Sequence, residues 1–426
     1  TDTYDPGSTF KILTASMALE EKAITVDSTF YCPGYRMVEG WPQPIKCWYY
    51  PRAHGSQNLY QAIQNSCNPA FIDIGQAVGA KTFLEYYKAF GLDEPTGIDL
   101  PGEGESIFHS EEQFLSNKVD LATASFGQNF QISPLQLITA VSAVANGGNL
   151  MKPYIVKEIL DSDGNIVEST EPTVVRQVIS EETSELMCDI LETVVSEGTG
   201  KNAYVAGYHI AGKTGTSEKK AKQAETGRND LRISSFIAFA PADDPQVAVL
   251  VILDEPTVQP VTGGITAAPV IRRIMSDILP YLGVEPTYTA EELEEKDVSV
   301  PEVIGMTKTE AESALSKVDL DYRVVGDGDT VTDQLPSYGS AIPGGSQVVL
   351  YMGAEKPTEP VQVPDVTGLS VSAARAQLER AGLYMKGSGA VSSSGNVVAS
   401  KQNITGTAAM GTVVTVEFTD LDQRAE

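Results

Sequence analysis

The sequence predicts a protein of the α/β class that ends in two small α+β modules. Residues Ile12–Leu19 are apolar on most faces, which is typical of a buried helix. Residues Ile233–Ala240 and Val247–Leu253 follow a polar loop and are rich in apolar residues, as buried strands are. A short motif that contains Pro301 returns 63 residues later at Pro364, and this repetition indicates a duplicated module.

The length and charge of the chain limit its organisation and its partners. With 426 residues it is too long for one ordinary hydrophobic core, so we expect several domains. Acidic residues outnumber basic residues by 57 to 30, and the formal net charge of -27 repels polyanions. We therefore expect no nucleic-acid partner.

The sequence contains no run of about 18 apolar residues, and residues 1–7 lack the apolar core of a signal peptide. These observations predict a soluble piece that neither spans a membrane nor targets itself. Because a candidate helix begins at Ser8, almost at the first residue, we expect the full-length protein to have residues before it.

The repeated motif spans Val300–Met306 in the first copy and Val363–Leu369 in the second. In each copy the motif's glycine precedes a helical pattern of alanines and leucines, and alternating strands follow between Gly, Ser and Pro turns. Each module is therefore predicted to be small and α+β. The predicted strands are Asp321–Val325 and Gln347–Tyr351 in the first copy and Val413–Phe418 in the second.

The boundaries between the predicted domains lie in charged or Pro-containing stretches. Four glutamates occur between positions 291 and 295, as in a solvated linker with one helical turn. Pro357 and Pro360 indicate a second, extended linker. The predicted division is a main domain over 1–285, an acidic linker over 286–298, a first module over 299–353, a linker over 354–361 and a second module over 362–419.

The four cysteines are Cys32, Cys47, Cys67 and Cys188. They form no C-x-x-C pair, and few histidines lie near them, so we expect no metal site. Cys32 and Cys47 flank a loop that contains Pro and Gly. In an oxidising compartment a disulfide between them would contribute about 3 kcal/mol. Cys67 and Cys188 are expected to be small buried hydrophobes.

Ser8 and Lys11 form the first candidate pair for chemistry. Positions i and i+3 are neighbours on a helix, so the Lys11 amine can reach the Ser8 hydroxyl, and burial would lower the pKa of the lysine toward that of a base. The alternative is a Ser8 N-cap beside a solvated lysine, because the same spacing occurs in Ser217–Lys220.

The second candidate element is Ser66 with Asn68, whose hydroxyl and amide can point into one cavity if the backbone is extended or turned. The alternative is a helix or turn cap. The third element is Lys213–Thr216, with the sequence Lys-Thr-Gly-Thr, which follows the strand-like Tyr208–Ala211 and is predicted to lie on an edge strand. There Lys213 can attract a carboxylate, and the Thr216 backbone N–H can face an oxyanion.

The three elements occur in the order Ser-x-x-Lys, Ser-x-Asn and Lys-Thr-Gly, which is the motif set of penicillin-binding proteins and serine β-lactamases. Over about residues 1–285 the chain resembles a class B penicillin-binding protein. The matching segments are Tyr4–Lys11, Asn65–Pro69, Phe126–Gln128 and Ala211–Thr216. Features before the second motif, such as Cys47-Trp48 and His54-Gly55, are more similar to the Gram-positive, stage V sporulation protein D type.

The duplicated module resembles PASTA domains through Val300-Pro301 with Gly305 and Val363-Pro364 with Gly368. The second copy departs from the first near its end, where Ala409-Met410 stands in place of Ile342-Pro343. A PASTA module of this kind is expected either to bind muropeptides or to pack as a structural domain.

The resemblance implies a peptidoglycan D-Ala-D-Ala transpeptidase that β-lactams acylate at Ser8. It assigns the nucleophile to Ser8, proton acceptance to Lys11, proton transfer toward the leaving amine to Ser66 and positioning of Lys11 to Asn68. It also implies the remaining roles: Lys213 attracts the terminal carboxylate, Thr214, Gly215 and Thr216 bind substrate, and the N–H groups of Ser8 and Thr216 form the oxyanion hole. No cofactor and no metal are implied.

The implied fold is an antiparallel sheet covered by helices, including the Ser8 helix and Thr266–Leu282, with a helical subdomain. The resemblance also implies an N-terminal membrane anchor, a place on the extracytoplasmic face of the bacterial membrane and a glycosyltransferase partner. Two alternatives remain open. One is a D,D-carboxypeptidase or β-lactamase, and the other is a non-catalytic sensor of muropeptides or β-lactams.

Overall fold

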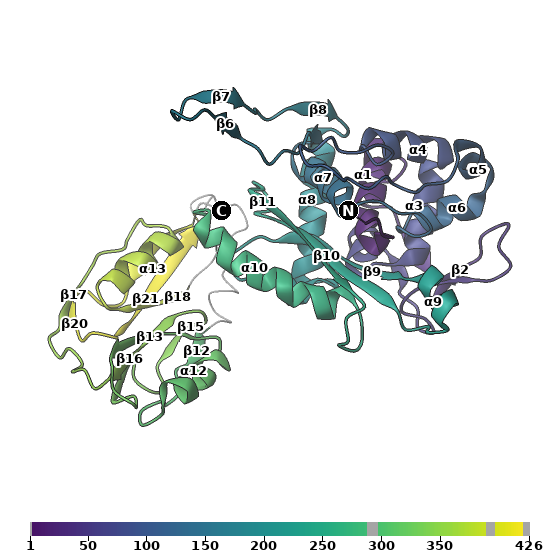
Figure 1. Cartoon of the computed structure of the whole chain (residues 1–426). Helices are drawn as coiled ribbons and strands as arrows, with labels where there is room; N and C mark the ends of the chain where they lie inside the picture. The colour runs from purple at the N-terminus through teal and green to yellow at the C-terminus, as the bar shows by residue number, and fades with distance from the viewer. Residues whose placement is uncertain (1, 288–296, 389–396, 421–426) are drawn as a thin grey trace. The chain divides into compact units, whose positions relative to one another are not determined.

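The computed structural model describes residues 2–287, 297–388 and 397–420 (Figure 1). The described residues form two compact units. The first comprises the residues up to Val205 together with His209–Val284, and the second comprises Ala206–Tyr208 and the described residues from Glu285 onward. Most of the predicted acidic linker, and its helical turn, lie outside the described residues. The predicted domain bounds stay a prediction.

A three-stranded antiparallel sheet forms the centre of the first unit (Figure 1). Its order is β11 (Val247–Asp254), β10 (Arg232–Ala240) and β9 (Ala211–Glu218), so β9 is an edge strand, as predicted. The register pairs Lys213 with Ile237. The sequence prediction was wrong for Tyr208–Ile210, which precede the strand, because β9 begins only at Ala211.

Helices cover both faces of this sheet. Alternate residues of a strand face opposite sides, and in β10 Ile237 and Phe239 belong to the hydrophobic core of α8 (Glu181–Ser196). Helix α10 (Ala268–Tyr281) packs against β10 and β11 and follows a π-helical turn. It confirms the helix predicted near Thr266–Leu282, although it begins two residues later.

The helix that follows Ser8 is the most enclosed helix of the first unit. Gly7–Phe10 form a 3-10 turn, η1, which leads directly into α1 (Lys11–Glu20). Nine of the ten residues of α1 are buried, from Lys11 to Leu19. Helix α1 packs against α3, α7 and α8. A helix with apolar residues on all sides is stable only inside a core, so the predicted buried helix is confirmed.

The remaining elements of the first unit surround α1 and the sheet (Figure 1). The other helices are α2 (Leu59–Gln64), α3 (Asn68–Val78), α4 (Ala80–Ala89), α5 (Glu111–Ser116), α6 (Lys118–Ala124), α7 (Pro134–Ala145), η2 (Lys201–Ala203) and α9 (Lys220–Thr226). The short strands are β1 (Phe30–Cys32), β2 (Tyr35–Arg36), β3 (Ile45–Lys46), β4 (Gly55–Gln57), β5 (Asn149–Met151), β6 (Glu158–Leu160), β7 (Ile166–Ser169) and β8 (Val174–Gln177).

The second unit contains two modules of the same design. Each has a short antiparallel pair, one helix, and a three-stranded sheet in which two strands are parallel. The first module has β12 (Asp297–Ser299), α12 (Lys308–Ser316), β13 (Asp321–Gly326), β14 (Asp333–Leu335), β15 (Ala341–Pro343) and β16 (Gln347–Met352). The second has β17 (Val361–Val363), α13 (Val371–Arg380), β18 (Tyr384–Ser388), β19 (Val397–Gln402), β20 (Gly406–Ala408) and β21 (Val413–Asp420).

A glutamine that sequence inspection missed fixes the repeated motif in each module. In the first, the Gln334 side chain accepts a hydrogen bond from Val303 N at 2.9 Å and donates to Pro301 O at 3.0 Å. In the second, Gln402 makes the equivalent bonds to Val366 N and Pro364 O at 2.8 and 3.0 Å. Because these backbone groups lie beside a turn, the glutamine replaces partners that a strand would supply.

Among the residues that the structure describes, no helix combines the length and the hydropathy that are needed to cross a membrane.

Replacing Gln334 by alanine should loosen the first module. Gln334 is 1% exposed, so the change leaves the Val303 N–H and the Pro301 carbonyl without their partner in a buried place. We expect a loss of about 2 kcal/mol of local stability, or roughly 30-fold faster amide exchange over residues 298–354. Hydrogen exchange with mass spectrometry measures this. Gln347→Ala is the control, because that side chain is exposed. Equal protection in both variants would refute the role of Gln334.

Candidate active site

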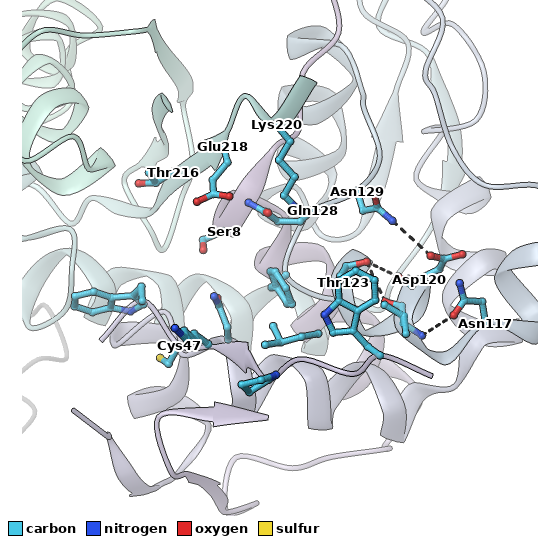
Figure 2. Close-up of a pocket in the computed structure, with 18 of the residues that line it drawn as sticks. Ser8, Cys47, Asn117, Asp120, Thr123, Gln128, Asn129, Thr216, Glu218 and Lys220 are labelled. Carbon is cyan, nitrogen blue, oxygen red and sulfur yellow. Dashed lines mark hydrogen bonds between the residues drawn. The ribbon is translucent and has the colours of Figure 1, made fainter. Parts of the chain in front are cut away.

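One residue from each of the three sequence motifs lines a single cavity of about 980 Å³ (Figure 2). Ser8 comes from η1, Asn68 from the first turn of α3 and Thr216 from β9. The other motif residues lie behind this wall, where Lys11, Ser66, Lys213 and Thr214 are buried. The fold therefore brings together side chains that are far apart in the sequence.

The Lys11 side chain crosses from α1 to the second motif. Its Nζ donates hydrogen bonds to Ser66 O at 2.7 Å and to Asn68 Oδ1 at 2.7 Å, and Ser66 Oγ lies at 3.2 Å. The same nitrogen lies 5.2 Å from the centre of the Phe71 ring. Of the hydrogen bonds of Lys11 Nζ in the described chain, none goes to Ser8, although the i, i+3 spacing is present.

The second motif forms a tight turn between two helices, as predicted. Helix α2 ends at Gln64, and α3 begins at Asn68 with Pro69 in its first turn. Ser66 has φ of 51°, in the left-handed region that residues other than glycine rarely adopt. This turn aims the Ser66 carbonyl and hydroxyl and the Asn68 amide at the same amine. Strain of this kind persists where neighbouring contacts impose it, and the contacts to Lys11 are of that type.

The third motif occupies the middle of the edge strand β9. Lys213 is completely buried, and its Nζ donates to Thr214 O at 3.1 Å and to Thr214 Oγ1 at 3.2 Å. A Cβ on Gly215 would lie 2.3 Å from Ser235 Oγ and 3.0 Å from Thr9 Cγ2. Glycine is therefore needed at this position so that η1 can pack against the strand.

The two buried lysines have displaced protonation equilibria. Burial lowers the pKa of Lys11 to about 7. Burial also lowers the pKa of Lys213 well below its ordinary value, and the nearby charge of Lys11 lowers it further. Because each ammonium disfavours the other, the site favours a state in which at least one amine is neutral. A neutral amine can accept a proton, as a general base must.

Close backbone packing fixes the position of Ser8. The Gly7 N–H donates to Gly127 O at 2.8 Å, and a Cβ on Gly127 would lie only 1.9 Å from Gly7 O. On the other side, a Cβ on Gly7 would lie 2.9 Å from Thr216 O. Gly7 is thus held between the segment at Gly127 and strand β9, and Ser8 follows directly.

Sequence inspection missed several polar residues of the cavity wall. Asp120, Gln128, Glu218 and Lys220 line it, and Glu218 forms an ion pair with Arg232 at 3.1 Å (Figure 2). Strand alternation could have indicated Glu218, because it lies two residues after Thr216 and faces the same side. Asp120 and Gln128 lie near helix ends far from the motifs, and no local pattern marks them.

All four cysteines have free thiols in the structure. Cys47 lines the cavity (Figure 2), and Cys67 stands between Ser66 and Asn68. The predicted disulfide between Cys32 and Cys47 stays a prediction.

The fold and the cavity together define a class of serine acyl-transferase-like sites, and comparison with protein families agrees. The model described as penicillin binding protein transpeptidase domain matches residues 1–276. The PASTA domain model matches residues 298–354 and 361–419. The chain therefore belongs to the penicillin-binding protein transpeptidase domain family, and it contains two PASTA domains.

Individual relatives are similar over the same region. The chain is 42% identical over 364 residues to stage V sporulation protein D from Bacillus subtilis, which covers 84% of this chain and 55% of that protein. The chain spans about half the length of the first curated relatives that it matches. These similarities confirm the predicted family and its subtype.

Solved structures give the same result. The transpeptidase domain of penicillin-binding protein 3 from Burkholderia pseudomallei has a TM-score of 0.59 and 30% identity, covering 67% of this chain and 82% of that one. Penicillin-binding protein 3 from Mycobacterium tuberculosis, complexed with aztreonam, has a TM-score of 0.60 and 27% identity, covering 67% and 64%. The predicted fold is confirmed, and the roles of individual site residues stay predictions.

Replacing Gly127 by alanine should displace Ser8. The new Cβ would collide with Gly7 O, and the φ of 82° adds backbone strain. We expect labelling by a fluorescent penicillin to slow at least about tenfold, because small displacements of a nucleophile are costly. Gly164→Ala is the matched control, since its φ is 84° and nothing lies within 4 Å of the added Cβ. Labelling of Gly127→Ala at the rate of the control would show that the contact does not position Ser8.

Proposed function

We propose that this chain is the catalytic part of a peptidoglycan D,D-transpeptidase that works through an acyl-enzyme on Ser8. The single observation that supports this most is the cavity whose wall joins Ser8, Asn68 and Thr216. A nucleophile, an amide and a strand-edge N–H on one wall are the parts that acyl transfer to and from a peptide needs.

In the first step, Ser8 Oγ attacks the carbonyl carbon of the penultimate D-Ala, and the hydroxyl proton passes to Lys11. The peptide C–N bond then breaks, and the terminal D-Ala leaves with a proton delivered through Ser66. In the second step, an amine of a neighbouring stem peptide attacks the ester, loses a proton and releases Ser8. Atoms balance, since one peptide bond is exchanged for another.

The contacts of Lys11 are consistent with its role as the base. A neutral amine has two N–H groups and one lone pair. Its two short hydrogen bonds go to Ser66 O and Asn68 Oδ1, which can only accept. The lone pair is then available for a hydroxyl proton, and the pKa near 7 permits this state at neutral pH. Hydrogen bonds to the nucleophile often tighten only when substrate binds.

Lys213 and the neighbouring strand would bind the substrate's terminal carboxylate and the developing oxyanion. A bound carboxylate raises the pKa of Lys213 by charge attraction, and the resulting ammonium favours neutral Lys11. Substrate binding would therefore prepare the base. The hydroxyls of Thr214 and Thr216 would hold the carboxylate. The N–H groups of Ser8 and Thr216 would hold the oxyanion, each contributing about 3 kcal/mol to the transition state.

We also propose the setting that the similarity to stage V sporulation protein D supports. The full-length protein would act on stem peptides at the extracytoplasmic face of a Gram-positive membrane, attached by an N-terminal anchor and working beside a glycosyltransferase. β-Lactams would act as substrate mimics that acylate Ser8. The similar penicillin-binding protein 3 from Mycobacterium tuberculosis, solved in complex with aztreonam, supports β-lactam binding by analogy.

Ser8→Ala should abolish covalent labelling. Intact-protein mass spectrometry after incubation with a penicillin is expected to show one adduct per chain on the wild type and none on Ser8→Ala. Wild-type circular dichroism of the variant would show that it folds. An adduct of equal yield on Ser8→Ala would refute Ser8 as the nucleophile.

The same preparation separates the reaction types. A pentapeptide donor ending in D-Ala-D-Ala, offered with an amine acceptor, should yield a cross-linked product and free D-Ala. Release of D-Ala without cross-linking would instead indicate a D,D-carboxypeptidase. Rapid turnover of nitrocefin would indicate a β-lactamase, and a stable adduct with no turnover of any donor would indicate a sensor.

Lys11→Met should lower the penicillin acylation rate about 10²- to 10⁴-fold, the usual contribution of a general base. Methionine keeps a similar shape but has no amine. Lys22→Met is the control, because Lys22 follows α1 on the exposed surface. Stopped-flow or quenched-flow acylation kinetics measure the effect. A Lys11→Met rate within a factor of two of the wild type would rule out the base.

A further inference from the structure

Three cysteines and a histidine form a cluster behind the cavity wall. The sulfurs of Cys32, Cys47 and Cys67 and a ring nitrogen of His54 all lie within 4.8 Å of one another. The cysteines are buried and the histidine is half-buried. The transpeptidase reaction proposed for Ser8 uses none of these four side chains.

Three separate elements of the chain converge to build this cluster. Cys32 ends strand β1 and pairs with Gly55 of β4, which places His54 beside it. Cys47 directly follows β3, and its N–H donates to Gly34 O at 2.8 Å. Cys67 lies in the turn between α2 and α3. Each ligand atom is thus attached to backbone that hydrogen bonds hold in place.

The spacing is close to that of a tetrahedral metal centre. Zn–S distances of about 2.3 Å and Zn–N distances of about 2.0 Å place neighbouring ligand atoms about 3.5 to 3.8 Å apart. Cys47 Sγ lies 3.6 Å from His54 Nδ1. The other separations stay below 4.8 Å, so small side-chain rotations would complete the geometry.

The histidine ring is oriented from outside the cluster. The rings of His54 and Tyr49 stack with centres 4.9 Å apart and an angle of 6° between their planes. Trp48 lies against the same imidazole at 5.8 Å. Rigid neighbours that fix a ligand ring are the usual second layer of a metal site.

We propose that Cys32, Cys47, Cys67 and His54 bind one zinc(II) ion in a closed, structural site. Three sulfurs and one imidazole match the preference of zinc for tetrahedral S and N ligands, whereas calcium and magnesium prefer oxygen. A disulfide would use only two of the sulfurs and would leave the third and the imidazole without a role. The expectation of no metal site is replaced by this proposal.

Binding requires the three thiols to lose their protons, so uptake of one zinc ion releases up to three protons to solvent. The bound ion would hold the turn that contains Cys67. Ser66 and Asn68 flank Cys67 and accept the hydrogen bonds of Lys11, so the ion would act as a staple beneath the cavity wall. This is a positioning role, because no ligand of the cluster touches the reacting atoms.

Metal uptake by the intact chain tests the proposal. The purified protein, reduced and stripped with a chelator, is titrated with cobalt(II) and then zinc(II). We expect one cobalt per chain, with thiolate-to-cobalt charge-transfer absorption and the strong visible bands of tetrahedral coordination. Zinc should displace these bands and raise the Tm of the first unit. Ser8→Ala should take up metal like the wild type, which separates this result from the proposed catalysis.

Matched variants locate the ion. Cys47→Ser and His54→Ala should weaken zinc binding at least about tenfold, whereas Cys188→Ser should leave it unchanged, because Cys188 is buried in α8 outside the cluster. Zinc analysis and the cobalt spectrum do not depend on activity. The wild-type titration also needs no variant to fold. Absence of tetrahedral cobalt bands in reduced wild type, with all three cluster thiols still reactive toward a thiol reagent, would overturn the proposal. Equal loss of binding in Cys188→Ser would do the same.

Discussion

A lysine side chain can leave water only if oxygen atoms and aromatic faces replace its hydration shell. For Lys11 these groups come from one turn, where Ser66 O and Asn68 Oδ1 each accept at 2.7 Å, and from the Phe71 ring. The left-handed Ser66 and the position of α3 follow from this requirement. The contact therefore joins α1 to the second motif and sets the wall on which Ser8 and Asn68 meet.

Much of the fold could be predicted because its signals are local. The apolar pattern of Ile12–Leu19 indicated α1, and the runs at Ile233–Ala240 and Val247–Leu253 gave β10 and β11. The prediction failed at Tyr208–Ile210, where apolar residues precede a strand that pairs only from Ala211. Pairing depends on a partner strand, and strand propensity alone does not specify where that partner begins.

The site was predictable as a set of motifs but not as a geometry. Spacing indicated that Ser8 and Lys11 are neighbours, yet the lysine's partners in the structure are Ser66 and Asn68, more than fifty positions away in sequence. The clasp of Gly7 by Gly127 and Thr216 likewise depends on contacts between distant segments. Gln334 and Gln402 show the same limit in the modules, because a buried glutamine is recognisable only once the backbone groups that it bonds are in place.

The cysteines illustrate how such a limit affects a functional inference. Metal motifs are recognised when two ligands lie a few residues apart, and Cys32, Cys47, His54 and Cys67 are too widely spaced for that. The fold compensates with β1, β3, β4 and the α2–α3 turn, which bring the four ligand atoms together. Since the last of these elements also holds Ser66 and Asn68, a ligand for the cluster and the partners of the buried lysine are set by the same backbone. Any change in the cluster, whether by metal, oxidation or substitution, must then act on the lysine through that turn.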